Sequence, residues 1–151
     1  MKVRYLLYLF AVLSLLTVAF IWGNSLKSIP QSSAQSSAVA DKVQSVVDPQ
    51  QKIERPTFHN HIRKLAHLIE FFALGLSVCG FTLCLGYECK KRLISLPLLI
   101  VLLIAVGDEF IQSFTGRGSM VSDILLDFAG ALAGLMVSAL IYRIILKFKT
   151  K

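Results

Sequence analysis

Four long apolar stretches constrain the fold of this 151-residue chain more than any other feature. They cover Tyr5–Trp22, Leu65–Tyr87, Leu93–Phe114 and Ile124–Leu146. Each supplies about 20 residues, the length that a helix needs to cross the roughly 30 Å hydrocarbon core of a bilayer. Because lipid offers no hydrogen-bond partners, the backbone of a spanning segment satisfies its own polar groups by forming a helix. The sequence therefore predicts an all-α fold, an integral membrane four-helix bundle.

Composition agrees with this prediction. Hydrophobic residues make up 55% of the chain and charged residues only 17%, against about 25% charged residues in soluble domains. The first apolar run is longer than the core of a signal peptide and has no small-residue cleavage site close behind it, so we expect it to be retained. We expect one membrane domain over residues 1–151, with spans at about 5–22, 65–87, 93–114 and 124–146 and an outer loop over 23–64.

The distribution of basic residues predicts the orientation of the four spans. Lys and Arg gather at the N-terminus, in the 88–92 loop and at the C-terminus, whereas the loop between the last two spans has only Arg117. Short basic loops stay on the cytoplasmic side, so both termini are expected to be cytoplasmic. Within the outer loop, Gln31–Ser37 is expected to be irregular. The valine spacing from Val39 to Pro49 favours an amphipathic helix on the outer membrane surface, with a disordered linker as the alternative.

Several ionisable or polar side chains lie inside these spans, where burial costs several kcal/mol and usually marks a functional site. With the predicted orientation, all of them fall in the outer half of the membrane. Helical spacing places Asp108 one turn from Gln112 and Asp123 one turn from Asp127, on shared faces. Arg117, between two glycines, is expected to fold over the carboxylates or to bind an anionic group of a ligand. The predicted ligand-binding residues are His67, Glu70, Asp108, Glu109, Gln112, Arg117, Asp123 and Asp127.

Three kinds of chemistry are open to this cluster. It could be a buried ion-pair network that holds the helices in register, which physics alone favours. It could supply a general acid and base for an enzyme, with Glu70, Asp108, Glu109 and Asp123 as candidate catalytic residues. It could also bind a metal through His67, Glu70, Asp108 and Asp123, although neither a metal nor another cofactor is expected. The net charge of +7 is explained by the basic cytoplasmic segments and by anionic lipids, so nucleic-acid binding is not expected.

The order and spacing of these residues resemble the VanZ-like family of bacterial membrane proteins. The segment Arg63–Phe71 is similar to that family's R-K-x-A-H-x-x-E-[YF] block, and Asp108–Gln112 to its D-E-x-x-Q block. The family's closing block is similar to a third set of residues, which comprises Arg117, Asp123 and Asp127, followed by Gly130 and Gly134. Phe71 stands where Tyr is frequent, and no proline precedes Arg117.

The resemblance implies a four-span membrane protein of the bacterial cell envelope. The family is named for a protein associated with low-level resistance to the glycopeptide teicoplanin, and it offers no settled reaction. The expected function is therefore a contribution to glycopeptide resistance through binding of an envelope or lipid-linked ligand at an outer polar site. A membrane enzyme acting on a phosphate-containing lipid and a structural, partner-binding protein are the alternatives. Expected partners are membrane lipids and a lipid-linked cell-wall precursor or glycopeptide; the oligomeric state is left open.

Overall fold

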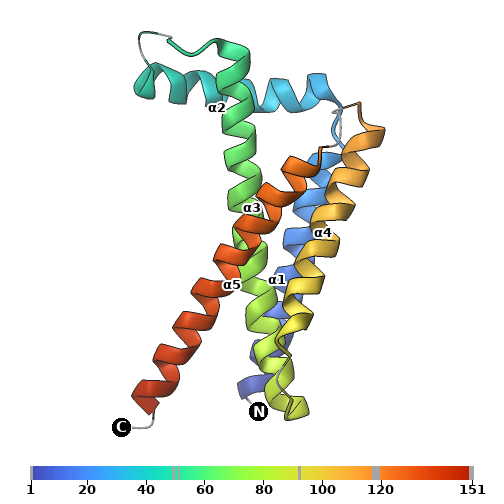
Figure 1. Cartoon of the computed structure of the whole chain (residues 1–151), viewed down its shortest axis with the longest axis vertical. Helices are drawn as coiled ribbons and strands as arrows, with labels where there is room; N and C mark the ends of the chain where they lie inside the picture. Colours follow the sequence, from blue (N-terminus) through green and yellow to red (C-terminus); the bar gives the residue numbers. More distant parts are fainter. Residues whose placement is uncertain (1, 49, 51, 92, 117–119, 150–151) are drawn as a thin grey trace.

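The structure is a computed structural model that describes residues 2–48, 50, 52–91, 93–116 and 120–149. Its helices are α1 (Lys2–Ser25), α2 (Ile29–Val47), α3 (Arg55–Cys89), α4 (Ser95–Phe114) and α5 (Val121–Lys149). All but α2 are long and apolar enough to cross a membrane. The predicted all-α membrane bundle with four spans is therefore confirmed. The two ends of the chain lie at the same end of the bundle, opposite α2 (Figure 1).

The helices extend beyond the predicted spans, most clearly at the start of α3. This helix begins at Arg55, well before the predicted start at Leu65, and its first turn contains Pro56. A proline in the first turn is favourable because its missing N–H has no helical partner there. Hydropathy detects only the apolar section of such a helix, so its polar first turns were assigned to the 23–64 loop.

The helix α2 corrects a second expectation. The Gln31–Ser37 segment was predicted to be irregular, but it forms the first part of α2, which begins at Ile29. The backbone N–H of Ser28 donates to the side chain of Gln31 (3.2 Å), and Pro30 lies in the first turn. These capping signals outweigh a Ser- and Gln-rich composition that suggests a loop. The predicted helix that ends near Pro49 is present, but it begins about ten residues before Val39.

The helix α2 lies across one end of the bundle, against the polar start of α3 (Figure 1). Gln44 Nε2 donates to the backbone oxygen of Ile53 at 3.0 Å. Asp41 pairs with Arg55 at 2.9 Å and with His59 at 3.0 Å. The hydrogen bond from His59 holds the pKa of the Asp41 carboxyl below its usual value. These polar contacts hold α2 to α3, and we refer to this part of the molecule as the α2 end.

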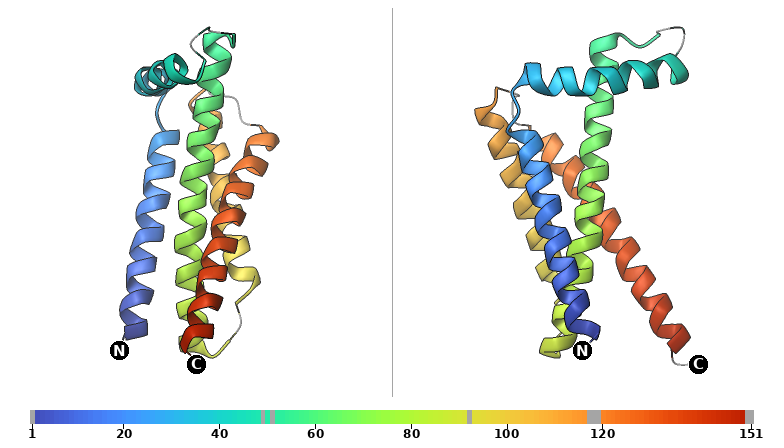
Figure 2. Two further views of the ribbon diagram at one scale, coloured as in Figure 1. Left: turned by 90° about the vertical axis from the view of Figure 1, so that its left-hand side faces the viewer. Right: turned by 180° about the vertical axis from the view of Figure 1, so that it is seen from behind.

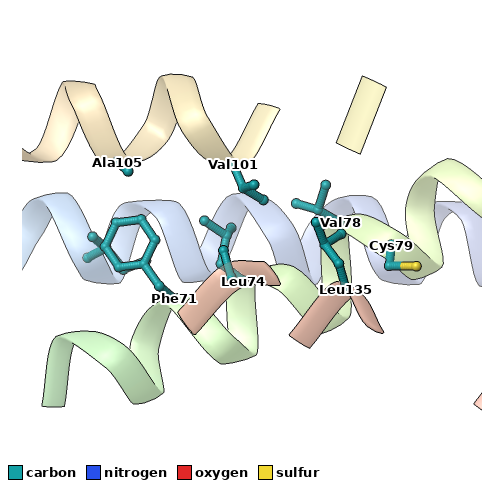
Figure 3. Close-up of a cluster of buried hydrophobic side chains, with 9 residues drawn as sticks. Phe71, Leu74, Val78, Cys79, Val101, Ala105 and Leu135 are labelled. Atoms are coloured by element: carbon teal, nitrogen blue, oxygen red, sulfur yellow. The ribbon is translucent and has the colours of Figure 1, made fainter. Parts of the chain in front are cut away.

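The long helix α3 forms the centre of the bundle, with α1 on one side and α5 on the other (Figure 2). Their inward-facing apolar side chains meet those of α4 in one cluster, shown in Figure 3. Phe71, Leu74 and Val101 are completely buried in it. The cluster comprises Ile21, Phe71, Leu74, Val78, Cys79, Val101, Ala105, Ala131 and Leu135.

Two glycines allow α5 to pack directly on the backbone of α3. A Cβ atom added at Gly130 would lie 2.6 Å from the backbone oxygen of Leu68, and one added at Gly134 would overlap the backbone oxygen of Phe72. Only glycine permits this approach, as in other small-residue seams between membrane helices. Gly130 and Gly134, in a G-x-x-x-G pattern, thus form the packing face of the last span, which brings the start of α5 alongside the middle of α3.

Candidate functional site

The centre of the candidate site is one side chain from each of three helices. His67 of α3 lies with Nδ1 3.7 Å from Asp108 Oδ2 of α4 and 4.0 Å from Asp127 Oδ1 of α5. Asp108 is completely buried and Asp127 is 2% exposed. Three predicted site residues, distant in sequence, are therefore brought together inside the bundle near the α2 end.

The α4 side of the site is organised by hydrogen bonds to its carboxylates. Gln112 Nε2, one helical turn along, donates to Asp108 Oδ2 at 2.8 Å, and both side chains are buried. The neighbouring Glu109 is also buried, and its Oε2 accepts the backbone N–H of Met120 at 3.1 Å. Glu109 thus ties α4 to the chain just before α5. The predicted pairing of Asp108 with Gln112 on one helix face is present in the structure.

Asp123 lies at the rim of the site. Its Oδ1 pairs with Lys64 Nζ at 2.5 Å, with the Asp123 side chain 15% and the Lys64 side chain 31% exposed. A pocket between α3, α4 and α5 begins beside this pair and reaches the buried centre. Its lining residues are Arg63, Lys64, His67, Glu109, Gln112, Asp123, Leu126 and Asp127. The lining of the pocket therefore combines two basic side chains with a histidine, a glutamine and three carboxylates.

Glu70 connects the cluster to α1, which the sequence did not predict as part of the site. Asn24 Nδ2 of α1 donates to Glu70 Oε1 at 3.1 Å, and Lys27 Nζ donates to Asn24 Oδ1 at 2.9 Å. Thr115, at the end of α4, also donates to the backbone oxygen of Ser25 at 3.3 Å. All four spanning helices thus contribute polar groups near the α2 end. Asn24 and Lys27 were detectable only as the first polar residues after the first apolar stretch.

Arg117, predicted to cover the carboxylates, lies outside the described residues. The basic residues that the structure places at the pocket are Arg63 and Lys64. Arg63 donates from Nη2 to Asn60 Oδ1 at 3.3 Å, one turn earlier on α3. The two basic side chains follow one another on α3, just before the turn that carries His67.

The arrangement can hold a cation at its buried centre. One donor atom from each of His67, Asp108 and Asp127 lies within 4.8 Å of the other two. This set differs from the one that the sequence suggested, because Asp123 pairs with Lys64 and Glu70 with Asn24. Asp127, one turn further along α5, takes their place.

Comparison with known proteins places the chain in a family. The family model described as VanZ/LLP1 matches residues 6–145, a range that includes most of α1 and α5, all of α3 and α4, and the polar cluster. Comparisons with curated proteins and with solved structures gave no match. The matched range covers nearly the whole chain, and this chain accordingly belongs to the VanZ/LLP1 family.

Proposed function

We propose that the protein acts in the bacterial cytoplasmic membrane, where it binds a phosphate-containing, lipid-linked envelope ligand and lowers susceptibility to teicoplanin-type glycopeptides. The observation that carries the proposal is the pocket between three spanning helices. It is lined by Arg63 and Lys64 together with His67 and Asp127 of the buried centre. A purely apolar bundle would be cheaper to insert in lipid, so the retention of these groups indicates a function.

The two basic side chains of the pocket, Arg63 and Lys64, favour a phosphate group. Guanidinium and ammonium groups form strong, charge-assisted hydrogen bonds with phosphate oxygens. Lys64 is 31% exposed even though it pairs with Asp123, so an entering phosphate can share or replace that pair. The outward-facing sides of the spanning helices expose many large apolar residues, which suits a ligand whose tail stays in the bilayer.

The distribution of basic residues supports an outward-facing pocket. The start of α1 carries Lys2 and Arg4, the end of α5 carries Lys147 and Lys149, and these two helix ends lie opposite the α2 end (Figure 1). Basic segments of this kind are retained in the cytoplasm, which would put the α2 end outside, where lipid-linked wall precursors are used. Resemblance to a family named for a teicoplanin-resistance protein supports the link to glycopeptides.

Binding is tested with purified protein in lipid nanodiscs and an isoprenoid diphosphate as the probe. We expect Lys64→Gln to weaken binding by about tenfold, the effect of losing one charge-assisted contact. Lys42→Gln, which removes an exposed lysine of α2, is the matched control and should leave binding unchanged. Equal binding by the wild type and the Lys64 variant, or equal binding of an uncharged isoprenol, would contradict the proposal.

The same variants separate binding from a structural role. Glu70→Gln keeps the size of the side chain, and if that protein inserts normally while teicoplanin protection is lost, the cluster does more than hold the helices together. An enzyme is the second candidate, because buried carboxylates lie beside the pocket and could act as acid and base. A change in the mass of the isoprenoid diphosphate after incubation would favour the enzyme, whereas an unchanged lipid that stays bound would favour the binding protein.

A further inference from the structure

We propose that His67, Asp108 and Asp127 form a binding site for one divalent transition-metal cation. The cation class follows from the donor set, one imidazole nitrogen and two carboxylate oxygens, which suits Zn²⁺ or Mn²⁺. The site would add a metal centre to the proposed binding protein. The metal site itself rests only on the geometry of these residues, whereas its role toward phosphate rests on the proposed function.

The separations between the donor atoms are close to those in metal sites. A tetrahedral ion with bonds of about 2.1 Å holds its donors about 3.4 Å apart. His67 Nδ1 lies 3.7 Å from Asp108 Oδ2 and 4.0 Å from Asp127 Oδ1, and all three donors lie within 4.8 Å of one another, so side-chain movements of about 1 Å or less would bring them around one ion. The three donors come from three different helices, and Gly130 and Gly134 hold two of these helices, α3 and α5, in direct backbone contact.

Charge balance gives a second argument. Two ionised carboxylates and a neutral imidazole carry a charge of −2, which a divalent cation neutralises. Asp108 and Asp127 are 0% and 2% exposed, at a depth where isolated charges are very costly. A cation held by both carboxylates gives a neutral unit in the low-dielectric interior of the bundle.

The surroundings of the three donors resemble the outer shell of a metal site. Gln112 Nε2 donates to Asp108 Oδ2 at 2.8 Å, and such hydrogen bonds orient ligating carboxylates. Both His67 and Asp127 also line the pocket that leads to Arg63 and Lys64. Three protein ligands leave a coordination position open, and that position would face the pocket, where a phosphate oxygen could complete the shell.

Metal binding is tested without any lipid ligand. A negative result then contradicts the metal site alone and leaves the proposed lipid binding untouched. Full-length protein in nanodiscs is stripped with a chelator, titrated with Zn²⁺ or Mn²⁺ and analysed for bound metal. We expect one equivalent per chain, and X-ray absorption of the loaded protein should show nitrogen and oxygen neighbours and no sulfur. Wild-type protein that retains no stoichiometric metal overturns the proposal.

Variants then locate the ion. We expect His67→Gln to abolish stoichiometric binding, and Gln112→Met, which removes only the orienting hydrogen bond, to weaken it by about 10- to 100-fold. His61→Gln, an exposed histidine on the same helix, is the matched control and should bind as the wild type does. Unchanged affinity in both His67→Gln and Gln112→Met contradicts the site. If His67→Gln does not fold, the Gln112→Met affinity and the wild-type absorption spectrum decide.

Binding of the isoprenoid diphosphate, measured with and without metal, separates the two proposals. If the metal binds but the affinity for isoprenoid diphosphate is the same with and without it, the metal site stands and its proposed role toward phosphate fails. If the diphosphate binds only to metal-loaded protein, both are supported.

Discussion

The two halves of α5 differ in what surrounds their side chains. From Val121 to Leu135 the helix buries Asp127, Gly130 and Ala131 against its neighbours. From Leu140 to Phe148 every side chain is exposed, and the helix diverges from the rest of the bundle (Figure 2). The difference teaches that lipid alone can solvate an apolar half-helix, whereas a buried carboxylate requires a close protein neighbour that supplies polar contacts.

The largest effect is expected from Gly134→Leu, in the seam half of α5. A side chain at this position meets the backbone oxygen of Phe72, which has no rotamer to change, so α5 must move away from α3. We expect a loss of about 3 kcal/mol or more in the free energy of unfolding, measured by denaturation in mild detergent. Gly23→Leu in α1, where nothing lies within 4 Å of an added Cβ, is the matched control. Equal stability of the two variants would show that the seam is not tight.

A smaller effect is expected at the rim of the same half, where Asp123 pairs with Lys64. The pair is partly exposed, so solvent screens it, and we expect a coupling energy of about 1 kcal/mol from a double-mutant cycle of Asp123→Leu and Lys64→Met. The Arg4–Glu88 pair, whose arginine is 73% exposed, is the comparison and should give a value closer to zero. A larger coupling energy at Arg4–Glu88 would contradict the expectation that the more buried ion pair interacts more strongly.

The smallest effect is expected in the diverging half. Ile144→Ala removes a side chain that is 46% exposed, and in a membrane its neighbours would be lipid chains. We expect the free energy of unfolding to change by less than about 0.5 kcal/mol, measured in the same detergent assay as Gly134→Leu. A loss of stability comparable with that of Gly134→Leu would contradict this expectation. It would show that the exposed half is covered by protein, for example by a second copy of the chain.

Much of the fold could be predicted from hydropathy, because spans of about 20 apolar residues have few alternatives in lipid. The early start of α3 at Arg55 could not, since its first turns are polar and are held by contacts with α2. The prediction for the Gln31–Ser37 segment was wrong because it relied on the Ser- and Gln-rich composition and did not consider the helix-capping pattern of Ser28 and Gln31.

Helical spacing also predicted much of the site. It placed Asp108 one turn from Gln112, and Asp123 one turn from Asp127. It did not show that Asp127, rather than Asp123, faces His67. That choice depends on how far α5 is rotated against α3, which packing decides and local sequence does not. The contribution of Asn24 was also missed. A single polar residue at the end of a span forms no helical pattern, so the sequence does not indicate which residue it contacts.

The buried carboxylates of α4 also bear on how the chain enters the membrane during synthesis. This is the shortest of the four spanning helices, and an acidic residue at the centre of a span opposes insertion by about 2.5 to 3.5 kcal/mol. Asp108 and Glu109 lie toward one end, where the penalty is smaller, but two acidic residues still oppose insertion of α4 on its own. Because α4 follows α3 in the chain, the helix that carries His67 is synthesised before the helix that carries Asp108. The order of the helices would therefore make a polar partner available when the carboxylates of α4 enter the membrane.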